Sequence, residues 1–210
     1  MMKKFLYMAA AALMLVACNS GKTTKVVAQW KENAPEKVKF IVGDMDTTVV
    51  VKDGKVEIKL PVDVTSVSRI HAGSSLKYTF ISDGSTLTLD SETNKFTSSK
   101  KDGVHSRYNA YNQWKKEFVD EYNAQIEKME KDSAEAEAFT QKTVDEYNAC
   151  LSKTVKDNKD NILAAIAVCD MTPVNPDEIL SLIESLPANI QALPDAVKAK
   201  KYCESLKSGE

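Results

Sequence analysis

Hydrophobic and polar residues alternate along the first part of the chain, from Val38 to Phe96. A period of two is typical of strands that bury one face. Asp53-Gly54 lies between two such runs and is a strong signal for a hairpin turn, and Asp83-Gly84-Ser85 marks a second turn. Because parallel strands need long crossovers, the pattern predicts about six antiparallel strands in a small β-sandwich or open barrel.

After Gly103 the hydrophobic spacing changes to the three- and four-residue steps of amphipathic helices. One stripe runs from Tyr108 to Met129, and a second helical pattern follows it. The polar stretch 133–138 between the two patterns fits either a bend or one continuous helix. The nearly all-apolar run from Ile162 to Val168 predicts the most buried helix.

Two further helices are predicted near the end of the sequence. Asn175-Pro176-Asp177-Glu178 has the residues of a helix start, with proline at the first helical position. The last helix should run from Pro194 toward Leu206, with Ala199, Tyr202, Cys203 and Leu206 facing inward. Gly209 follows it as a C-capping glycine. Strands followed by helices indicate an α+β fold with a β lobe and a helical lobe.

The first residues have the layout of an export signal. Lys3 and Lys4 precede the apolar run Phe5–Val16, which is shorter than the ~20 residues that span a bilayer. Leu15-Val16-Ala17-Cys18 resembles the bacterial lipobox. That resemblance implies cleavage before Cys18 and attachment of diacylglycerol and an amide-linked chain such as palmitate to this residue. The chain is therefore expected to be a lipoprotein anchored to a bacterial membrane.

The residues after Cys18 lack the acidic side chains that direct some lipoproteins to the cell surface, which favours a periplasm-facing position on the inner or outer membrane. The following stretch is polar and small, as expected of a tether. The predicted organisation is a signal peptide at 1–17, a lipidated tether at 18–36, an antiparallel β lobe at 37–98 and a helical lobe at 99–210.

Charge argues against nucleic acid as a partner. The precursor has 28 basic and 30 acidic residues, and removal of Lys3 and Lys4 leaves 26 against 30, a net charge of −4. A nucleic-acid-binding protein would carry a basic footprint. The expected partners are the membrane, through the lipid on Cys18, and a protein of the cell envelope.

Three cysteines remain beside Cys18: Cys150, Cys169 and Cys203. They form no Cys-x-x-Cys motif and no zinc-ligand spacing. All three fall in helical stretches near apolar residues. They can be buried thiols, they can include one disulfide, or one of them can be a redox-active thiol.

Other residues give little sign of catalysis. His71 and His105 lie in different predicted elements and are expected to be exposed or to cap an element. Asp44 and Asp46 lack the further ligands of a calcium loop and fit a polar turn. We expect no metal, no cofactor and no catalytic residue.

Trp114 is the most distinctive residue of the helical lobe. Tyr111, Phe118 and Tyr122 share one stripe, and Trp114 falls about a quarter turn away from it. It can pack against the β lobe, or it can be an anchor for a binding partner, because tryptophan is enriched in interaction hot spots.

Several segments resemble the N-terminal domain of unknown function that precedes the thioredoxin-like domain in lipoproteins of the thiol-disulfide oxidoreductase class. The similar segments are the hairpin Lys52–Ile58, the element Phe80–Leu89, the helix entry Asp157–Asn161 and the helix Glu178–Leu186. The thioredoxin-like domain of that class, with its Cys-x-x-Cys, is absent from this sequence. The resemblance therefore implies the non-catalytic part of such proteins, folding alone and without disulfide reductase activity.

Two functions remain from the sequence. The first is a lipid-anchored binding or interaction module, accessory to a redox partner. The alternative is a thiol-dependent redox protein that uses Cys150, Cys169 or Cys203.

Overall fold

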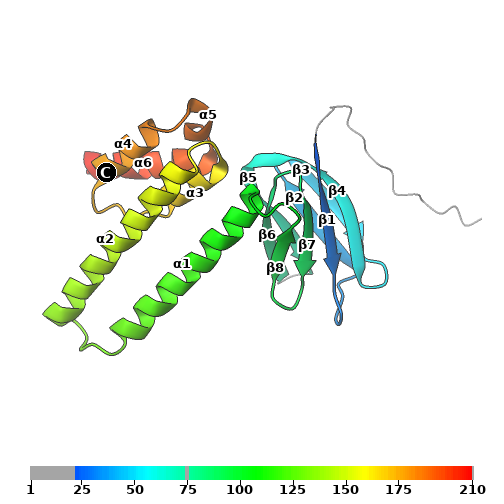
Figure 1. Ribbon diagram of the computed structural model, residues 1–210, viewed down its shortest axis with the longest axis horizontal. Helices are drawn as coiled ribbons and strands as arrows, with labels where there is room; N and C mark the ends of the chain where they lie inside the picture. Colours follow the sequence, from blue (N-terminus) through cyan, green and yellow to red (C-terminus); the bar gives the residue numbers. More distant parts are fainter. Residues whose placement is uncertain (1–21, 74–75, 210) are drawn as a thin grey trace, which may run out of the picture.

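The computed structural model describes residues 22–73 and 76–209 and has an α+β fold (Figure 1). Two four-stranded sheets face each other and do not close into a barrel, and helices follow them in the chain. One sheet has the order β4-β1-β7-β8 and the other the order β3-β2-β5-β6. The strands are β1 (Thr23–Gln29), β2 (Lys37–Val42), β3 (Met45–Val50), β4 (Lys55–Pro61), β5 (Asp63–Ala72), β6 (Leu76–Ser82), β7 (Thr86–Asp90) and β8 (Lys95–Ser98).

Strand β1 corrects the predicted tether at 18–36. Its residues alternate between the core and the surface, and Val26 and Ala28 are fully buried. It lies between β4 and β7, in the middle of its sheet. The polar residues at alternate positions, such as Lys25, gave the segment the composition of a linker, although a strand with one exposed face has the same composition.

The prediction of purely antiparallel pairing is wrong at one place. Strands β1 and β7 pair in parallel, with Val26 opposite Leu87. Parallel neighbours need a long connection. Here the connection consists of β2 to β6, which build the whole second sheet and strand β4 of the first sheet before the chain returns.

The sandwich core comes from the alternation that the sequence displays. Phe40, Ile70 and Phe80 of one sheet meet Leu60 and Leu87 of the other, and all five are completely buried. Burial of a side chain of this size stabilises the fold by about 1.5–3 kcal/mol. This core holds the two sheets together without a closing strand.

The helical lobe begins with a long hairpin. The sequence left open whether 133–138 is a bend or part of one continuous helix, and the structure has a bend. One helix ends at Ile126, and Ser133 caps the next helix by accepting a hydrogen bond from the Ala136 amide at 3.2 Å. No helix among the described residues is both long and apolar enough to cross a membrane. The helices are α1 (Val104–Ile126), α2 (Ala134–Asp157), α3 (Ile162–Cys169), α4 (Pro176–Glu184), α5 (Ala188–Gln191) and α6 (Pro194–Ser208).

Helix α3 is the most buried helix, as predicted, with six of its eight residues in the core. The predicted helix start at Asn175 is also present, since its side chain accepts a hydrogen bond from the Glu178 amide. The inward orientation predicted for Tyr202 and Leu206 is wrong, because these side chains are 55% and 45% exposed. The inward orientation predicted for Ala199 and Cys203 is confirmed, and Ala196 is buried with them.

His105 joins the two lobes and corrects the prediction of an exposed or capping histidine. Its ring is completely buried and lies between the edge strands β6 and β8. The Ile81 amide donates to Nδ1 at 3.2 Å, so the proton of the neutral ring is assigned to Nε2, 3.4 Å from the Phe96 carbonyl oxygen. One side chain therefore satisfies backbone groups at the edges of both sheets.

We expect Val26→Thr to lower the free energy of unfolding by about 1–3 kcal/mol, because it places a hydroxyl in the apolar sandwich core. Val27→Thr is the matched control, since Val27 points to the half-buried outer face of the same strand and should change stability by about 0.5 kcal/mol or less. Chemical denaturation followed by circular dichroism measures both. Equal, negligible effects would show that the segment is a tether after all.

The stability of the protein should also depend on the protonation of His105. Burial lowers the pKa of this histidine below its usual 6.5, although the Phe96 carbonyl and Asp83 oppose the shift. The unfolded state then binds more protons than the native state, so the free energy of unfolding should fall as the pH drops below about 6.5.

His105→Gln should flatten this dependence between about pH 7 and 5. Asp63 and Asp90, whose pKa values are lowered by hydrogen bonds from neighbouring residues, lose their stabilising contribution only at lower pH. Urea denaturation across this range separates the two effects. An unchanged slope in the variant would contradict the role of the buried ring.

Candidate functional site

Trp114 lies in an aromatic seam between α1 and α2 and does not pack chiefly against the β lobe. Its ring stacks on Tyr147 of α2, with centroids 5.5 Å apart and an interplanar angle of 12°. Phe118 lies 5.1 Å from the same tyrosine ring. Further along the hairpin, Tyr122 stacks on Phe139 at 5.9 Å. The aromatic spacing in the sequence therefore builds a helix–helix contact.

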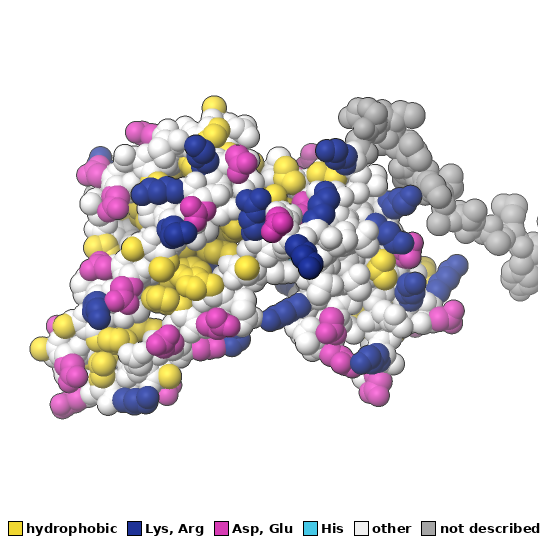
Figure 2. Space-filling model, in the orientation of Figure 1, with side chains coloured by type: hydrophobic (Ala, Val, Ile, Leu, Met, Phe, Trp, Pro, Cys, Tyr) yellow, Lys and Arg dark blue, Asp and Glu magenta, His cyan; other side chains and the backbone are white. Residues whose placement is uncertain are grey.

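The seam has a neighbour on one side only. Residues 104–157, the α1–α2 arm, extend away from the sandwich, and α3 packs along the inner part of the arm (Figure 1). Apolar side chains are visible between the two helices (Figure 2). Trp114 is half-buried, and Val119, one residue after Phe118, is 45% exposed. Exposed apolar surface of this kind marks a candidate interaction site.

A polar cluster fixes the base of the arm. Asp170, directly after α3, accepts hydrogen bonds from the Tyr111 hydroxyl at 2.7 Å and from the Lys115 ammonium at 2.6 Å. Burial raises the pKa of Tyr111 well above its usual value, and burial and Asp170 raise that of Tyr147 to about 12. Both phenols stay protonated at neutral pH, and the hydrogen bonds to Asp170 tie α1 to the end of α3.

The three thiols are free and lie in different surroundings. Cys203 is buried, Cys169 is half-buried and Cys150 is exposed on α2. Burial raises the pKa of the Cys169 and Cys203 thiols, which is opposite to the shift that a nucleophilic cysteine needs. The expectation of a buried thiol holds for Cys203 and is wrong for Cys150.

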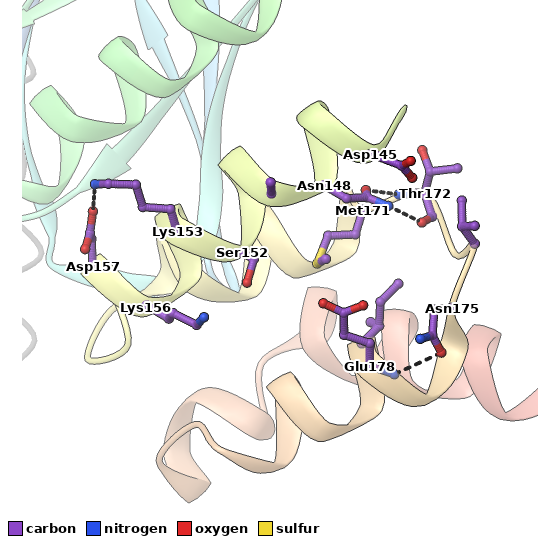
Figure 3. Close-up of a pocket in the computed structure, with 13 residues that line it drawn as sticks. Asp145, Asn148, Ser152, Lys153, Lys156, Asp157, Met171, Thr172, Asn175 and Glu178 are labelled. Atoms are coloured by element: carbon purple, nitrogen blue, oxygen red, sulfur yellow. Dashed lines mark hydrogen bonds and ion pairs between the residues drawn. The ribbon is translucent and has the colours of Figure 1, made fainter. Parts of the chain in front are cut away.

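A groove of about 560 Å³ lies between α2 and α4 (Figure 3). Met171 and Ile179 supply its apolar part, and Asn148 holds one wall through two hydrogen bonds with the backbone of Thr172. Lys153 is paired with Asp157 at 2.5 Å, and Val174 is 55% exposed. The groove is open, mixes both charges and brings together no nucleophile with a base, so it does not resemble a catalytic cleft.

Of the remaining candidates, Asp44 and Asp46 are exposed, whereas His71 is half-buried and its Nε2 atom is buried without a hydrogen-bond partner among the described residues. Asp44 lies in the turn between β2 and β3, and Asp46 pairs with Lys39 at 2.7 Å. His71 sits between Lys39 and Lys77 on neighbouring strands. Within the part of the chain that the structure describes, no cluster of three histidine, cysteine or carboxylate side chains could hold a metal.

Cys18, the residue of the predicted lipid attachment, lies outside the described residues. The nearest structured element is β1, which begins five positions later at Thr23. Comparisons with protein-family models, curated proteins and solved structures found no match.

The exposure of the thiols leads to a labelling prediction. A water-soluble alkylating reagent should modify Cys150 at the rate of an ordinary exposed thiol, whereas Cys203 should react only when the protein unfolds. Mass spectrometry of the digested, labelled protein measures each site. Cys150→Ser should remove the fast phase and Cys203→Ser should leave it. Fast modification of Cys203 in the native protein would contradict the structure.

Proposed function

We propose that this chain is a lipid-anchored interaction module of the bacterial cell envelope, with the α1–α2 arm as its partner-binding surface. The observation that carries the proposal is the arm itself: two helices, of 23 and 24 residues, that extend from the sandwich with an aromatic seam between them. An interaction surface needs exposed apolar anchors on a rigid support. The arm supplies the apolar groups through the half-buried Trp114 and the exposed Val119, and the hydrogen bonds to Asp170 hold the foot of the arm.

The charge of the arm indicates the chemistry of the partner. Residues 104–157 include eleven acidic and eight basic side chains. A partner with an apolar strip flanked by lysine or arginine would complement both features. A protein of this kind fits better than a nucleic acid, whose phosphates the acidic arm would repel.

A link to redox chemistry would run through that partner, which would have to bring its own Cys-x-x-Cys motif. The resemblance to the N-terminal domain of the oxidoreductase lipoproteins motivates this part of the proposal. The alternative, a thiol-dependent protein, is favoured by a single observation, the exposure of Cys150. The raised pKa values of Cys169 and Cys203 leave these two thiols without a role in it.

The proposal is tested by site-specific photo-crosslinking of the lipidated protein in native membranes. A crosslinker at Val119 should capture a partner, and Val119→Asp should abolish complex formation, because a carboxylate would replace an exposed apolar side chain of the proposed surface. Val50→Asp is the control, since Val50 is also exposed, at 55%, but lies on β3.

Both variants should keep the circular dichroism spectrum and the melting temperature of the wild type, because each replaces an exposed side chain. Loss of the complex in Val50→Asp but not in Val119→Asp would move the binding surface to the β lobe. A partner that crosslinks through an acidic segment would contradict the proposed charge complementarity.

A further inference from the structure

We propose that one end of the β lobe rests on anionic phospholipid headgroups, so that the protein is oriented on the membrane as well as attached to it. This proposal rests on the lipid anchor at Cys18. It concerns the end of the sandwich at which β1 begins, here named the anchor-end surface. The side chains that define it are Lys22, Pro61, Val62, Val64, Lys100 and Lys101.

The first argument is the length of chain between the lipid and the fold. Thr23 lies five positions after Cys18, and a fully extended chain over five positions spans about 17 Å. The predicted tether, ending at Glu36, would have allowed about 60 Å. The first residue of β1 is therefore held close to the headgroups, and the surface around it has to lie next to them.

The second argument is that four segments converge at this end. Thr23 pairs with Pro61, the last residue of β4, and the Thr24 hydroxyl accepts a hydrogen bond from the Gly84 amide at 2.8 Å. A Cβ atom on Gly84 would lie 3.6 Å from the Lys100 ammonium and 3.7 Å from the Lys22 Cβ. Lysines from separate segments thus gather around one point beside the anchor.

The charges at this surface are available to an anionic partner. Lys22, Lys100 and Lys101 are exposed, and within the described residues none of them has a carboxylate within 4.0 Å. The Lys100 ammonium donates to the Asp83 carbonyl oxygen at 3.3 Å. The Asp83 carboxylate is occupied by the backbone amides of Ser85 and His105. Lysines held this close to a bilayer attract its anionic lipids.

Apolar residues accompany the lysines. Val64 is 41% exposed, Pro61 is exposed and Val62 is half-buried beside Gly84. Apolar side chains next to basic ones are the combination that binds the interfacial region of a bilayer. In solution the exposed Val64 side chain is in contact with water, which is unfavourable. On a membrane the interfacial region would remove this side chain from water and stabilise the bound state.

The net charges of the β lobe and of the α1–α2 arm agree with this orientation on the membrane. Residues 22–98 carry eleven basic and ten acidic side chains, whereas residues 104–157 carry eight basic and eleven acidic ones. Lys and Arg side chains gather on the visible face of the β lobe (Figure 2). The tip of the α1–α2 arm lies far from the start of β1 (Figure 1). An anionic surface therefore attracts the β lobe and repels the arm.

The test uses the mature lipidated chain on vesicles of phosphatidylcholine with and without phosphatidylglycerol. Amide hydrogen exchange should slow at 61–64, 83–85 and 100–103 on the phosphatidylglycerol vesicles and remain unchanged in the turn 127–133 at the tip of the arm. Because the Debye length is about 3 Å at 1 M salt, high salt should remove the difference.

Lys100→Glu with Lys101→Glu should abolish this protection, because the charge at the anchor-end surface is reversed. Lys128→Glu with Lys131→Glu is the control: these lysines are also exposed and the change in net charge is the same, but they lie at the tip of the arm, so the protection should persist. Protection of 127–133 in the wild type, or equal protection on both kinds of vesicle, would overturn the proposal.

The failure of the anchor and the failure of the orientation are distinguishable. Cys18→Ala should lose both fatty-acid labelling and flotation with vesicles. A wild-type chain that fails to float would overturn the lipid anchor and the orientation with it. A wild-type chain that floats but shows no lipid-dependent protection would leave the anchor in place and overturn the orientation alone.

Discussion

The structure depends on how the open edge of the sandwich is closed. Strands β6 and β8 end their sheets without pairing with each other, and unpaired edges are exposed to aggregation. His105 binds backbone groups of both strands, and Asn109 adds a hydrogen bond to the Phe96 carbonyl oxygen at 2.5 Å. Because these residues form the first turns of α1, the interaction that closes the edge also fixes the direction in which the arm leaves the sandwich.

Local patterns in the sequence predict most of the elements but not all of their partners. The change in period after Gly103, the cap at Asn175 and the apolar run of α3 are short-range signals, and each element forms where it is predicted. Strand β1 was missed because its alternation is blurred: the buried face includes the polar Thr24, and the outer face includes the apolar Val27. Its parallel pairing with β7 depends on the whole second sheet, which no local pattern encodes.

In the candidate site, too, the sequence predicts local features but not the residues that meet them from other parts of the chain. Aromatic spacing along α1 predicts a stripe that includes Tyr111 and Phe118, but it cannot identify Tyr147 as the residue on which Trp114 stacks. Burial of His105 also depends on β6 and β8 arriving from earlier parts of the chain. The exposure of Cys150 could have been inferred from the helix, because Leu151 and Val155 carry the buried face of α2 and Cys150 lies outside it.

In the proposed anchored state, the short link between Cys18 and β1 limits what the arm can reach. An α-helix of 23 residues is about 35 Å long, so the tip of α1 stays within that distance of the His105 joint. A long flexible tether would let the domain sample many positions, whereas the proposed link of four residues and the proposed orientation of the β lobe would confine the arm to a narrow zone above the bilayer. Confinement raises the effective concentration of the arm for targets in that zone, and targets outside it rarely meet the arm. The proposed attachment therefore favours a partner that is itself held at the same membrane over one that diffuses freely.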